Sequence, residues 1–437
     1  MTADVPAHPV VHWTEDGAAR SARWRSERAA PAPKNVVIVD DRTRADDAYG
    51  LACQGTALLW RGDFQNARQL LAALATRADR RPRKAGKAEA KPATGPTTRS
   101  ATDTTTRSAT EAAARPAAGS ATESSPASRA DAFNRERQAR SQRARTLGML
   151  LIQLEADYGI ALRRAPDLRQ ACMEAYGPAE SASLVSLREL LGVIGAHEWR
   201  GNGIHIAALA GRIHPHFGVF APTRSEYIDL VATASLPPAA GAPAATAFDI
   251  GTGTGVLAAV LARRGVGRVI ATDQDPRALA CAAENIARLG LAERVEVVHA
   301  NLFPAGRAAL AVCNPPWVPA RPNSPLEHGI YDPESRMLRG FLAALPAHLE
   351  PEGEGWLILS DLAEHLGLRS RAELLAAFDA AGLRVVDRID AQPRHPRASD
   401  PTDPLHRARA AEVTSLWRLA VQTASSKQQG PRSLAGP

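Results

Sequence analysis

A chain of 437 residues, 45% of them hydrophobic, is long enough for about two or three domains and for at least one large core. Its formal net charge of +7 suits a polyanionic partner, and its four scattered cysteines, which form no CxxC pair, argue against a disulfide-stapled fold and favour a reducing compartment. The chain has neither a long apolar run nor a basic and then apolar N-terminus, so we expect a cytoplasmic protein that makes no membrane contact.

The N-terminal segment, residues 1–76, has a short apolar run at 36–39 followed by helix-like stretches at 48–60 and 65–74. Residues 77–130 are dominated by Ala, Thr, Ser, Pro, Arg and Lys and have almost no large apolar side chain. Such a composition cannot bury a core, which predicts a disordered, low-complexity linker.

The segment that follows, residues 131–200, has leucines at helical spacing between 133 and 156. We expect it to be helical and to form one small, mainly helical domain with residues 35–76, because neither part alone offers a complete core. On its first helix Arg137, Arg140 and Arg143 recur every three residues. They form either a stripe that faces nucleic-acid phosphates or an ordinary solvated helix face.

Residues 201–422 begin with a hairpin pattern at 204–220 and then alternate between strand and helix. Strands are expected at 247–250, 268–272, 295–300, 310–313, 356–360, 385–389 and 413–421. Helices are expected at 256–263, 276–289, 335–349 and 372–381. This alternation predicts an α/β fold with a doubly wound, mostly parallel, seven-stranded sheet of Rossmann-like type, in which the last two strands pair antiparallel at one edge.

Residues 423–437 are expected to form a disordered tail. Three histidines near the hairpin, His205, His214 and His216, lack a cysteine or carboxylate at ligand spacing, so we predict no metal site.

A glycine-rich loop follows the first strand of the sheet. Gly251, Gly253 and Gly255 alternate with threonines, of which Thr252 is the first, and they let the backbone turn sharply and approach a ligand closely. The spacing is GxGxG and Asp249 precedes it. A carboxylate there would repel a pyrophosphate, but it suits the cationic amino group of a methionine moiety.

The next two strands end in polar residues that suit a nucleoside. Asp273 ends the second strand, where an acidic side chain accepts hydrogen bonds from ribose hydroxyls. Asn301 and Leu302 follow the third strand, and the Asn301 amide either bonds the adenine edge or only turns the chain. Asp275, just before Pro276, is expected to cap its helix.

The fourth strand ends in Asn314, Pro315, Pro316 and Trp317. Paired prolines make a stiff turn whose carbonyl groups stay free to accept hydrogen bonds. The Asn314 side-chain oxygen and the Pro315 carbonyl can hold both hydrogens of an NH2 group, while Trp317 stacks on the planar group that carries it. This arrangement points the nitrogen toward a sulfonium methyl and asks for orientation rather than for a nucleophile. Neighbouring Cys313 is expected to be a packed core thiol.

Four motifs follow one another along the chain: the residues from Asp249 to Gly255, Asp273, the Asn301 turn and the Asn314 turn. In this order they resemble the motifs of class I S-adenosylmethionine-dependent methyltransferases, in the subgroup called methyltransferase small domain. The resemblance covers roughly residues 217–420 and implies S-adenosyl-L-methionine as the cofactor. It also places the segment at 216–226 near that cofactor. Residues 329–336, including Tyr331, Asp332 and Arg336, are interpreted as a substrate lip or as an ordinary surface loop.

The acceptor is left open by these motifs. The net positive charge of the chain favours a nucleic-acid substrate. We therefore expect methylation of adenine N6, first in RNA and less strongly in DNA. The alternative is the N5 amide nitrogen of a glutamine in a translation protein, since an amide presents the same planar pair of hydrogens. A third alternative is an inactive S-adenosylmethionine-binding module, against which the intact motifs argue. The oligomeric state is not indicated.

Overall fold

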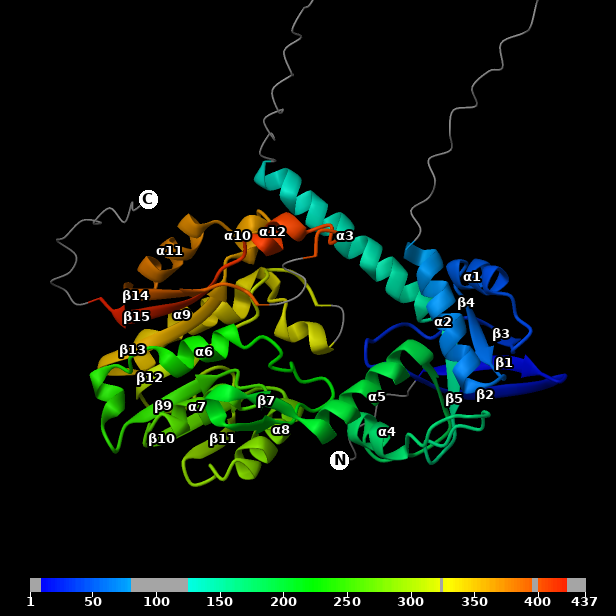
Figure 1. Cartoon of the computed structure of the whole chain (residues 1–437), viewed down its shortest axis with the longest axis horizontal. Helices are drawn as coiled ribbons and strands as arrows, with labels where there is room; N and C mark the ends of the chain where they lie inside the picture. Colours follow the sequence, from blue (N-terminus) through cyan, green and yellow to red (C-terminus); the bar gives the residue numbers. More distant parts are fainter. Residues whose placement is uncertain (1–8, 80–124, 323–324, 395–399, 423–437) are drawn as a thin grey trace, which may run out of the picture.

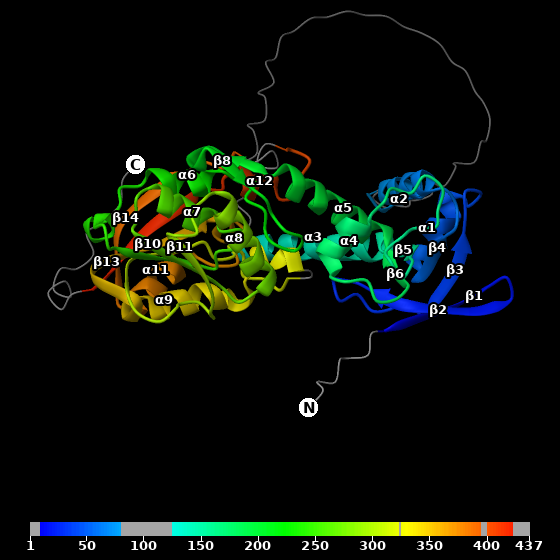
Figure 2. The same cartoon turned by 90° about the horizontal axis from the view of Figure 1, so that it is seen from below.

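The computed structural model describes residues 9–79, 125–322, 325–394 and 400–422. Two α/β domains lie at opposite ends of the molecule, and the long helix α3 (Pro126–Leu147) runs from one to the other (Figures 1 and 2). The linker expected at 77–130 lies mostly, and the tail expected at 423–437 wholly, outside the described residues. Within the described parts of the chain, no helix is long and apolar enough to span a membrane.

The C-terminal domain is built on a seven-stranded sheet with the order β11-β10-β9-β12-β13-β15-β14. Its strands are β9 (Thr246–Ile250), β10 (Arg268–Asp273), β11 (Val295–His299), β12 (Ala308–Cys313), β13 (Leu349–Ser360), β14 (Leu383–Ala391) and β15 (Thr414–Val421). The first five strands in this order are parallel, and β15 is antiparallel to both of its neighbours. The predicted doubly wound, mostly parallel sheet with an antiparallel edge is confirmed.

Helices cover both faces of this sheet. One face is covered by α6 (Glu226–Thr233), α7 (Val256–Arg263) and α8 (Pro276–Arg288), the other by α9 (Arg336–His348) and α11 (Arg371–Ala380). Successive strand residues therefore enter different cores: Ala247 packs with α6 and α7, whereas Phe248 packs with α9. Short helical segments complete the domain, namely η1 (Ala207–Leu209), η2 (Pro238–Gly241), η3 (Pro325–Gly329), η4 (Pro333–Ser335), α10 (Leu362–His365) and α12 (His406–Ala410).

An antiparallel hairpin begins the C-terminal domain, as the sequence predicts. It consists of β7 (Ile204–Ile206) and β8 (Gly211–Ile213). Ile206 and Ile213 are buried in the same core as α7, so the hairpin is fixed to the helical layer that carries the glycine-rich loop.

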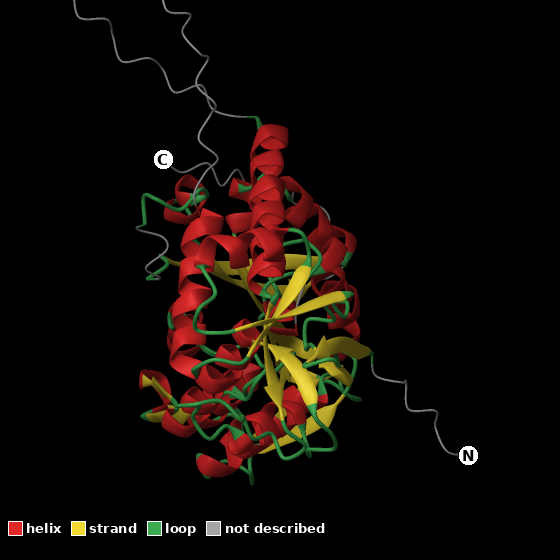
Figure 3. Cartoon of the chain, turned by 90° about the vertical axis from the view of Figure 1, so that its right-hand side faces the viewer, coloured by secondary structure: helices red, strands yellow, loops and turns green. Residues whose placement is uncertain are grey.

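The N-terminal domain is not mainly helical, and that expectation is wrong. It holds a six-stranded sheet with the order β1-β2-β6-β5-β4-β3, whose strands are yellow in Figure 3, where this end of the molecule faces the viewer. The strands are β1 (Val10–Glu15), β2 (Ala18–Arg25), β3 (Asn35–Val39), β4 (Thr56–Trp60), β5 (Leu150–Leu154) and β6 (Ser183–Ser186). The helices are α1 (Ala45–Cys53), α2 (Phe64–Asp79), α4 (Arg169–Tyr176) and α5 (Leu187–Asn202).

The helical stretches expected at 48–60 and between 133 and 156 each contain a strand, β4 and β5, and both errors have one physical cause. Strands β4 and β5 lie in the centre of the sheet and are almost wholly buried, so they lack the alternation of apolar and polar residues that marks a strand with one wet face. A short run of leucines then fits a helix equally well. The pairing of Leu58 with Leu150 joins the segments before and after residues 80–124 in one sheet.

Helix α3 contacts both domains. Its Phe133 packs in a cluster of the C-terminal domain that includes Val318 and Tyr331. Near its other end, Arg143 forms an ion pair of 2.6 Å with Asp79 of α2. The arginines at helical spacing are engaged in this way with the protein itself: Arg137 lies over the Tyr331 ring, at 4.4 Å from its centroid, and Arg140 pairs with Glu136. They do not form an unoccupied stripe.

Trp356 on β13 offers a test of the packing of the C-terminal core. Its side chain is fully buried, and its indole N–H donates to Glu354 at 2.9 Å. We expect Trp356→Ala to lower the free energy of unfolding by about 3–5 kcal/mol, because it leaves a large cavity. Urea unfolding followed by circular dichroism measures this. Trp199→Ala, at a side chain that is 45% exposed, is the control and should stay within about 0.5 kcal/mol; equal losses would contradict the described core.

Candidate functional site

The candidate site lies where the strand order of the C-terminal sheet reverses. Strands β9 and β12 are parallel neighbours, yet α7 after the first and α9 after the second cover opposite faces. The register pairs Ile250 with Cys313, the last residue of each strand. The glycine-rich loop and Asn314, the next residues along each strand, therefore lie side by side at the edge where open α/β sheets bind ligands.

The glycine-rich loop needs its glycines for two different reasons. All three have positive φ, +73° at Gly251, +55° at Gly253 and +81° at Gly255. A Cβ on Gly251 would collide with Met337, and one on Gly255 would press on Ala282 of α8. A Cβ on Gly253 would meet nothing within 4 Å. The loop is thus packed tightly at both ends and leaves open space above its middle.

Asp249 is buried under this loop, with 1% of its surface exposed. Its carboxylate accepts hydrogen bonds from the Thr252 hydroxyl at 2.6 Å and from the Ala258 backbone N–H at 3.0 Å. Burial outweighs these bonds and raises the pKa of Asp249 to about 6. Asp249 thus ties the loop to the first turn of α7, a role that was not apparent from its place before the glycines.

Asp273 ends β10 directly beside the loop. Its carboxylate accepts hydrogen bonds from the backbone N–H groups of Gly253 and Asp275, both at 3.0 Å. Burial raises the pKa of this carboxyl. Asp275 in turn accepts from the Arg277 N–H at 2.9 Å and caps α8, as predicted. Asp273 therefore borders the open space above Gly253.

The turn after β11 reaches the same edge. The backbone N–H of Ala300 donates to the Asp273 carbonyl at 3.1 Å, and the Leu302 carbonyl accepts from the Thr272 hydroxyl at 2.7 Å. Leu302 has a positive φ of +69°, rare for this residue type. The Asn301 side chain between them is exposed. The turn is fixed beside β10, and Asn301 is left accessible to a ligand.

In the turn after β12, the indole N–H of Trp317 donates to the Asn314 side-chain oxygen at 2.9 Å. An amide oxygen can accept two hydrogen bonds, so one acceptor position of Asn314 remains. The guanidinium of Arg224 lies 4.9 Å from the Trp317 ring centroid, and it forms ion pairs with the buried carboxylates of Glu226 at 2.7 Å and Glu412 at 3.0 Å. Arg224 thus covers part of the indole. The contacts described make Trp317 a support that orients Asn314. The stacking role expected from the sequence stays a prediction.

The expected substrate lip is only partly a surface feature. Tyr331 and Asp332 are buried. The Asp332 carboxylate accepts from the backbone N–H groups of Met337 and Leu338, at 3.1 and 3.2 Å, and so holds the first turn of α9. Burial raises the pKa of Asp332. Arg336 and the residues 328–330 are exposed. Asp332 thus supports the lip from within.

Asn285 of α8 is a site residue that the sequence analysis missed. It is fully buried, and its amide donates to the carbonyls of Thr254 at 3.1 Å and His214 at 3.2 Å, while its oxygen accepts from the His214 N–H at 2.7 Å. It therefore joins the glycine-rich loop to the segment after β8. The signal was present, because Asn285 falls on the same helical face as the buried Ala278, Cys281 and Ala282.

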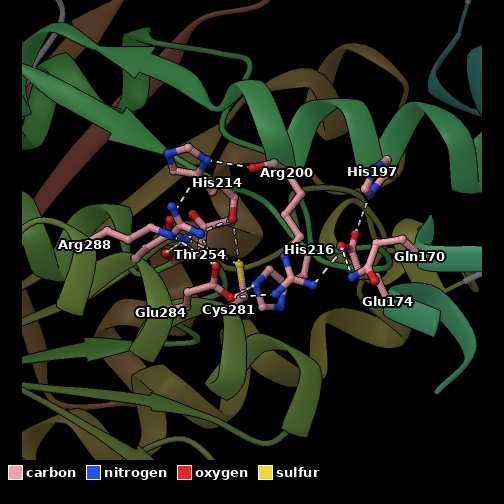
Figure 4. A network of polar contacts seen from close by, with 11 residues as sticks. Gln170, Glu174, His197, Arg200, His214, His216, Thr254, Cys281, Glu284 and Arg288 are labelled. Atoms are coloured by element: carbon pink, nitrogen blue, oxygen red, sulfur yellow. Dashed lines mark hydrogen bonds and ion pairs between the residues drawn. The ribbon is translucent and has the colours of Figure 1, made fainter. Parts of the chain in front are cut away.

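Beside Asn285, Glu284 is the centre of a wider polar network, shown in Figure 4. Its carboxylate contacts Arg200 of α5 at 2.7 Å, His216 at 2.8 Å and Arg288 at 2.7 Å. Burial raises the pKa of Glu284, but the hydrogen bonds from the two guanidinium groups and from His216 outweigh it and hold this pKa at about 2. The network links the N-terminal domain to α8. Two of the three histidines noted in the sequence thus have protein partners, and no metal-binding group of three or more suitable side chains occurs in the part of the chain that the structure describes.

We expect Asn285→Leu to weaken cofactor binding about tenfold and to destabilise the fold by about 1–3 kcal/mol, because it leaves the buried carbonyl of Thr254 without a donor. Calorimetric titration and urea unfolding check the two effects. Asn202→Leu, at an exposed position at the end of α5, is the matched control. Unchanged cofactor affinity in a folded Asn285→Leu protein would show that the loop does not depend on this brace.

The buried carboxyl of Asp249 predicts a pH dependence. A carboxyl with a raised folded-state pKa stabilises the protein most where it is protonated, so its contribution is fully present below its ordinary pKa of 3.8 and is lost as pH rises through about 6. We expect the unfolding free energy of the wild type, relative to that of Asp249→Asn, to fall by about 3 kcal/mol between about pH 4 and about pH 7. Urea unfolding across this range measures it. A flat difference would rule out the titration.

Residues 211–379 match the family model called Methyltransferase small domain. A release factor glutamine methyltransferase of Cereibacter sphaeroides is 36% identical over 35% of this chain and 58% of its own length. A ribosomal protein L11 methyltransferase of Pelotomaculum thermopropionicum is 51% identical over 16% of this chain and 24% of its own. The chain thus spans little more than half of the first of these relatives and a quarter of the second.

Among solved structures, a ribosomal protein L11 methylase from Lactobacillus delbrueckii subsp. bulgaricus matches 48% of this chain and 86% of its own, with 17% identity and a TM-score of 0.34. The matched segment of the family model begins at β8 and ends in α11, and it includes the glycine-rich loop, Asp273, Asn301 and the Asn314 turn. This part of the chain is therefore similar to the methyltransferase small domain group of class I S-adenosylmethionine-dependent methyltransferases.

Proposed function

We propose that this chain is an S-adenosylmethionine-dependent N-methyltransferase whose acceptor is the side-chain amide of a glutamine in a translation protein. The observation that carries the proposal is the register of Ile250 opposite Cys313, which brings the glycine-rich loop next to Asn314. A cofactor on the loop and an NH2 group at Asn314 are then neighbours, as direct transfer of a methyl group requires.

The residues of the loop fit the cofactor. The space above Gly253 is open, and the Asp273 carboxylate at its border can accept bonds from ribose hydroxyls. Asn301 is exposed in the turn after β11, beside the end of β10, where its amide can reach the adenine edge. Asp249 would carry a negative charge toward the amino group of the methionine part, in addition to bracing the loop. The backbone of this site is shaped by Gly251, Thr252, Gly255 and Leu302.

Hydrogen-bond acceptors of the chain would hold the NH2 group that receives the methyl group. The free acceptor position of Asn314 and the carbonyl of Pro315 would each take one hydrogen of the NH2 group, while rigid Pro316 keeps the turn in place. When bound, S-adenosylmethionine supplies an electrophilic methyl group. The chain orients the nitrogen lone pair and stabilises the positive charge that develops on nitrogen through Asn314. The surplus proton leaves the nitrogen to solvent.

The choice of a protein amide over adenine rests on the relatives. Two of them are named release factor glutamine methyltransferases, and several others are named ribosomal protein L11 methyltransferases. These names favour a translation protein over RNA, which was the first expectation from the sequence. The arginines of α3 support the same choice, because Arg137, Arg140 and Arg143 contact the protein itself.

The identity of the methyl acceptor can be tested with an extract of cells that lack this enzyme, in which the acceptor is not yet methylated. The purified chain is incubated with the extract and S-adenosylmethionine labelled in the methyl group. We expect the label to be released by protease and to be recovered as N5-methylglutamine after digestion. Label released by nuclease would instead support adenine N6, and absence of S-adenosylmethionine binding in calorimetry would overturn the enzymatic proposal.

Asn314→Ala tests the methyl-transfer turn. We expect turnover to fall about 100-fold to 1,000-fold, because the acceptor loses an oriented hydrogen-bond partner, while cofactor affinity stays within about twofold. Single-turnover transfer of labelled methyl and calorimetry measure the two quantities. Asn202→Ala, at the exposed end of α5, serves as the control. Equal loss of turnover and of cofactor binding would make the turn structural.

A further inference from the structure

A cavity of about 300 Å³ lies between the two domains, close to the edge of the candidate site. It is bounded by the loop after β2, by one face of α5 and by residues 215–221, which lead into the C-terminal domain. Its connection to the site is direct on two sides. Glu27 on its wall forms an ion pair of 2.7 Å with Arg277, in the first turn of the helix that follows Asp273. Phe220, next to its lining residues, packs on Gly329 of the lip.

Four charged side chains line this cavity, two acidic and two basic, and only the acidic ones have partners. Glu27 pairs with Arg277, and the Glu189 carboxylate accepts from the Glu27 N–H at 3.1 Å and from the Tyr176 hydroxyl at 3.2 Å. Arg28 and Arg188 have no hydrogen bond or ion pair among the residues that the structure describes. The cavity thus offers two free guanidinium groups and no free carboxylate.

The electrostatics of Arg188 agree with this arrangement. Burial and the neighbouring cations Arg28 and Arg143 lower its pKa, and the negative charge of Glu327 in η3, just before the lip, opposes that effect only in part. Two like charges held near each other in a partly buried space are unfavourable unless an anion joins them. An anion that bound both guanidinium groups would relieve this repulsion.

Apart from His216, whose ring bonds Glu284, the rest of the lining is apolar. On α5, Gly192, Gly195 and Ala196 share one face and leave a shallow floor, and a Cβ on either glycine would meet nothing within 4 Å. Trp199, one turn further, is 45% exposed. Phe217 closes the opposite wall and is held edge-on by Tyr176, at 6.2 Å between ring centroids. An apolar side chain can therefore lie on the floor beside the charged groups.

We propose that this cavity is the docking subsite for the protein substrate, and that it takes an acidic side chain next to an aromatic or aliphatic one. The carboxylate would bind Arg28 and Arg188, and the apolar side chain would cover the glycine floor beside Trp199. The proposal rests on the proposed function, because it supplies the sequence context of the methylated glutamine. Its position between the Asp273 edge and the lip allows a peptide held there to reach the Asn314 turn.

The charge pattern favours a peptide over a nucleic acid. A strand of nucleic acid carries a phosphate at every nucleotide and is normally bound by a groove that is basic throughout. Here Glu27 and Glu189 stand in the same wall as the arginines. Two cations among carboxylates suit one or two isolated acidic side chains, and the apolar floor suits their neighbour.

The test measures binding by fluorescence anisotropy with the full chain and three probes that carry the same neutral dye. The first is a short peptide with one glutamine, one phenylalanine and three glutamates; the second replaces the glutamates by glutamines; the third is a short oligouridine. Arg28→Glu and Arg188→Glu alter the cavity. Arg28 is exposed, so its replacement leaves the core intact. Arg384→Glu on the far edge strand β14 is the matched control, since its side chain is exposed as well.

We expect the acidic peptide to bind the wild type about tenfold more tightly than the neutral one, and each cavity variant to lose about that factor while Arg384→Glu does not. Equal binding of the two peptides, or acidic-peptide binding that is the same in all variants, would overturn the proposal. Loss of oligouridine binding alone in the cavity variants would overturn it in favour of nucleic acid. Calorimetry with S-adenosylmethionine on the same proteins tests the proposed function separately, because the cofactor contacts neither arginine in that proposal.

Discussion

The parallel pairing of β9 with β12 is the contact on which the candidate site depends. All six residues of β12 are buried, and β9 is buried along four of its five. A shift of one residue would turn every apolar side chain of the strand toward the wrong core, so the pairing of Ile250 with Cys313 is strongly specified. The distance between the glycine-rich loop and Asn314 is therefore set by packing far from any ligand. The polar residues of the site can vary without loss of this frame.

The sequence predicted the C-terminal domain well because its signals are local. Asp275 and Pro276 mark a helix start, Gly382 marks a helix end, and the glycines announce the loop. The signals that failed are those that need the tertiary structure. Strands β4 and β5 could not be told from helices, since burial on both faces removes their alternation. The Asn285 brace joins positions 71 residues apart, and the cover of Trp317 by Arg224 joins distant loops. No pattern within a short window encodes such contacts.

Residues of the N-terminal domain form ion pairs with a helix beside the candidate site, although the motifs of the site all lie in the C-terminal part of the chain. Arg200 of α5 and Glu27 in the loop after β2 each form an ion pair with α8, the helix that follows Asp273 and carries Asn285. These pairs are partly exposed, so each contributes little to stability by itself. Their common attachment to α8 matters more, because movement of the N-terminal domain would be transmitted to the helix that braces the glycine-rich loop.

The ion pair of Arg143 with Asp79 has a consequence for how this family of chains can change in length. It joins the end of α2 to the last turns of α3, whereas Phe133 in the first turns of α3 packs on the C-terminal domain. The described residues on either side of 80–124 are thus held by contacts that do not involve that segment. The entropic cost of closing a loop rises by only about 0.6 kcal/mol for each doubling of its length. With the flexible linker that the composition predicts between these two helices, we expect insertions or deletions there to change the free energy of unfolding little.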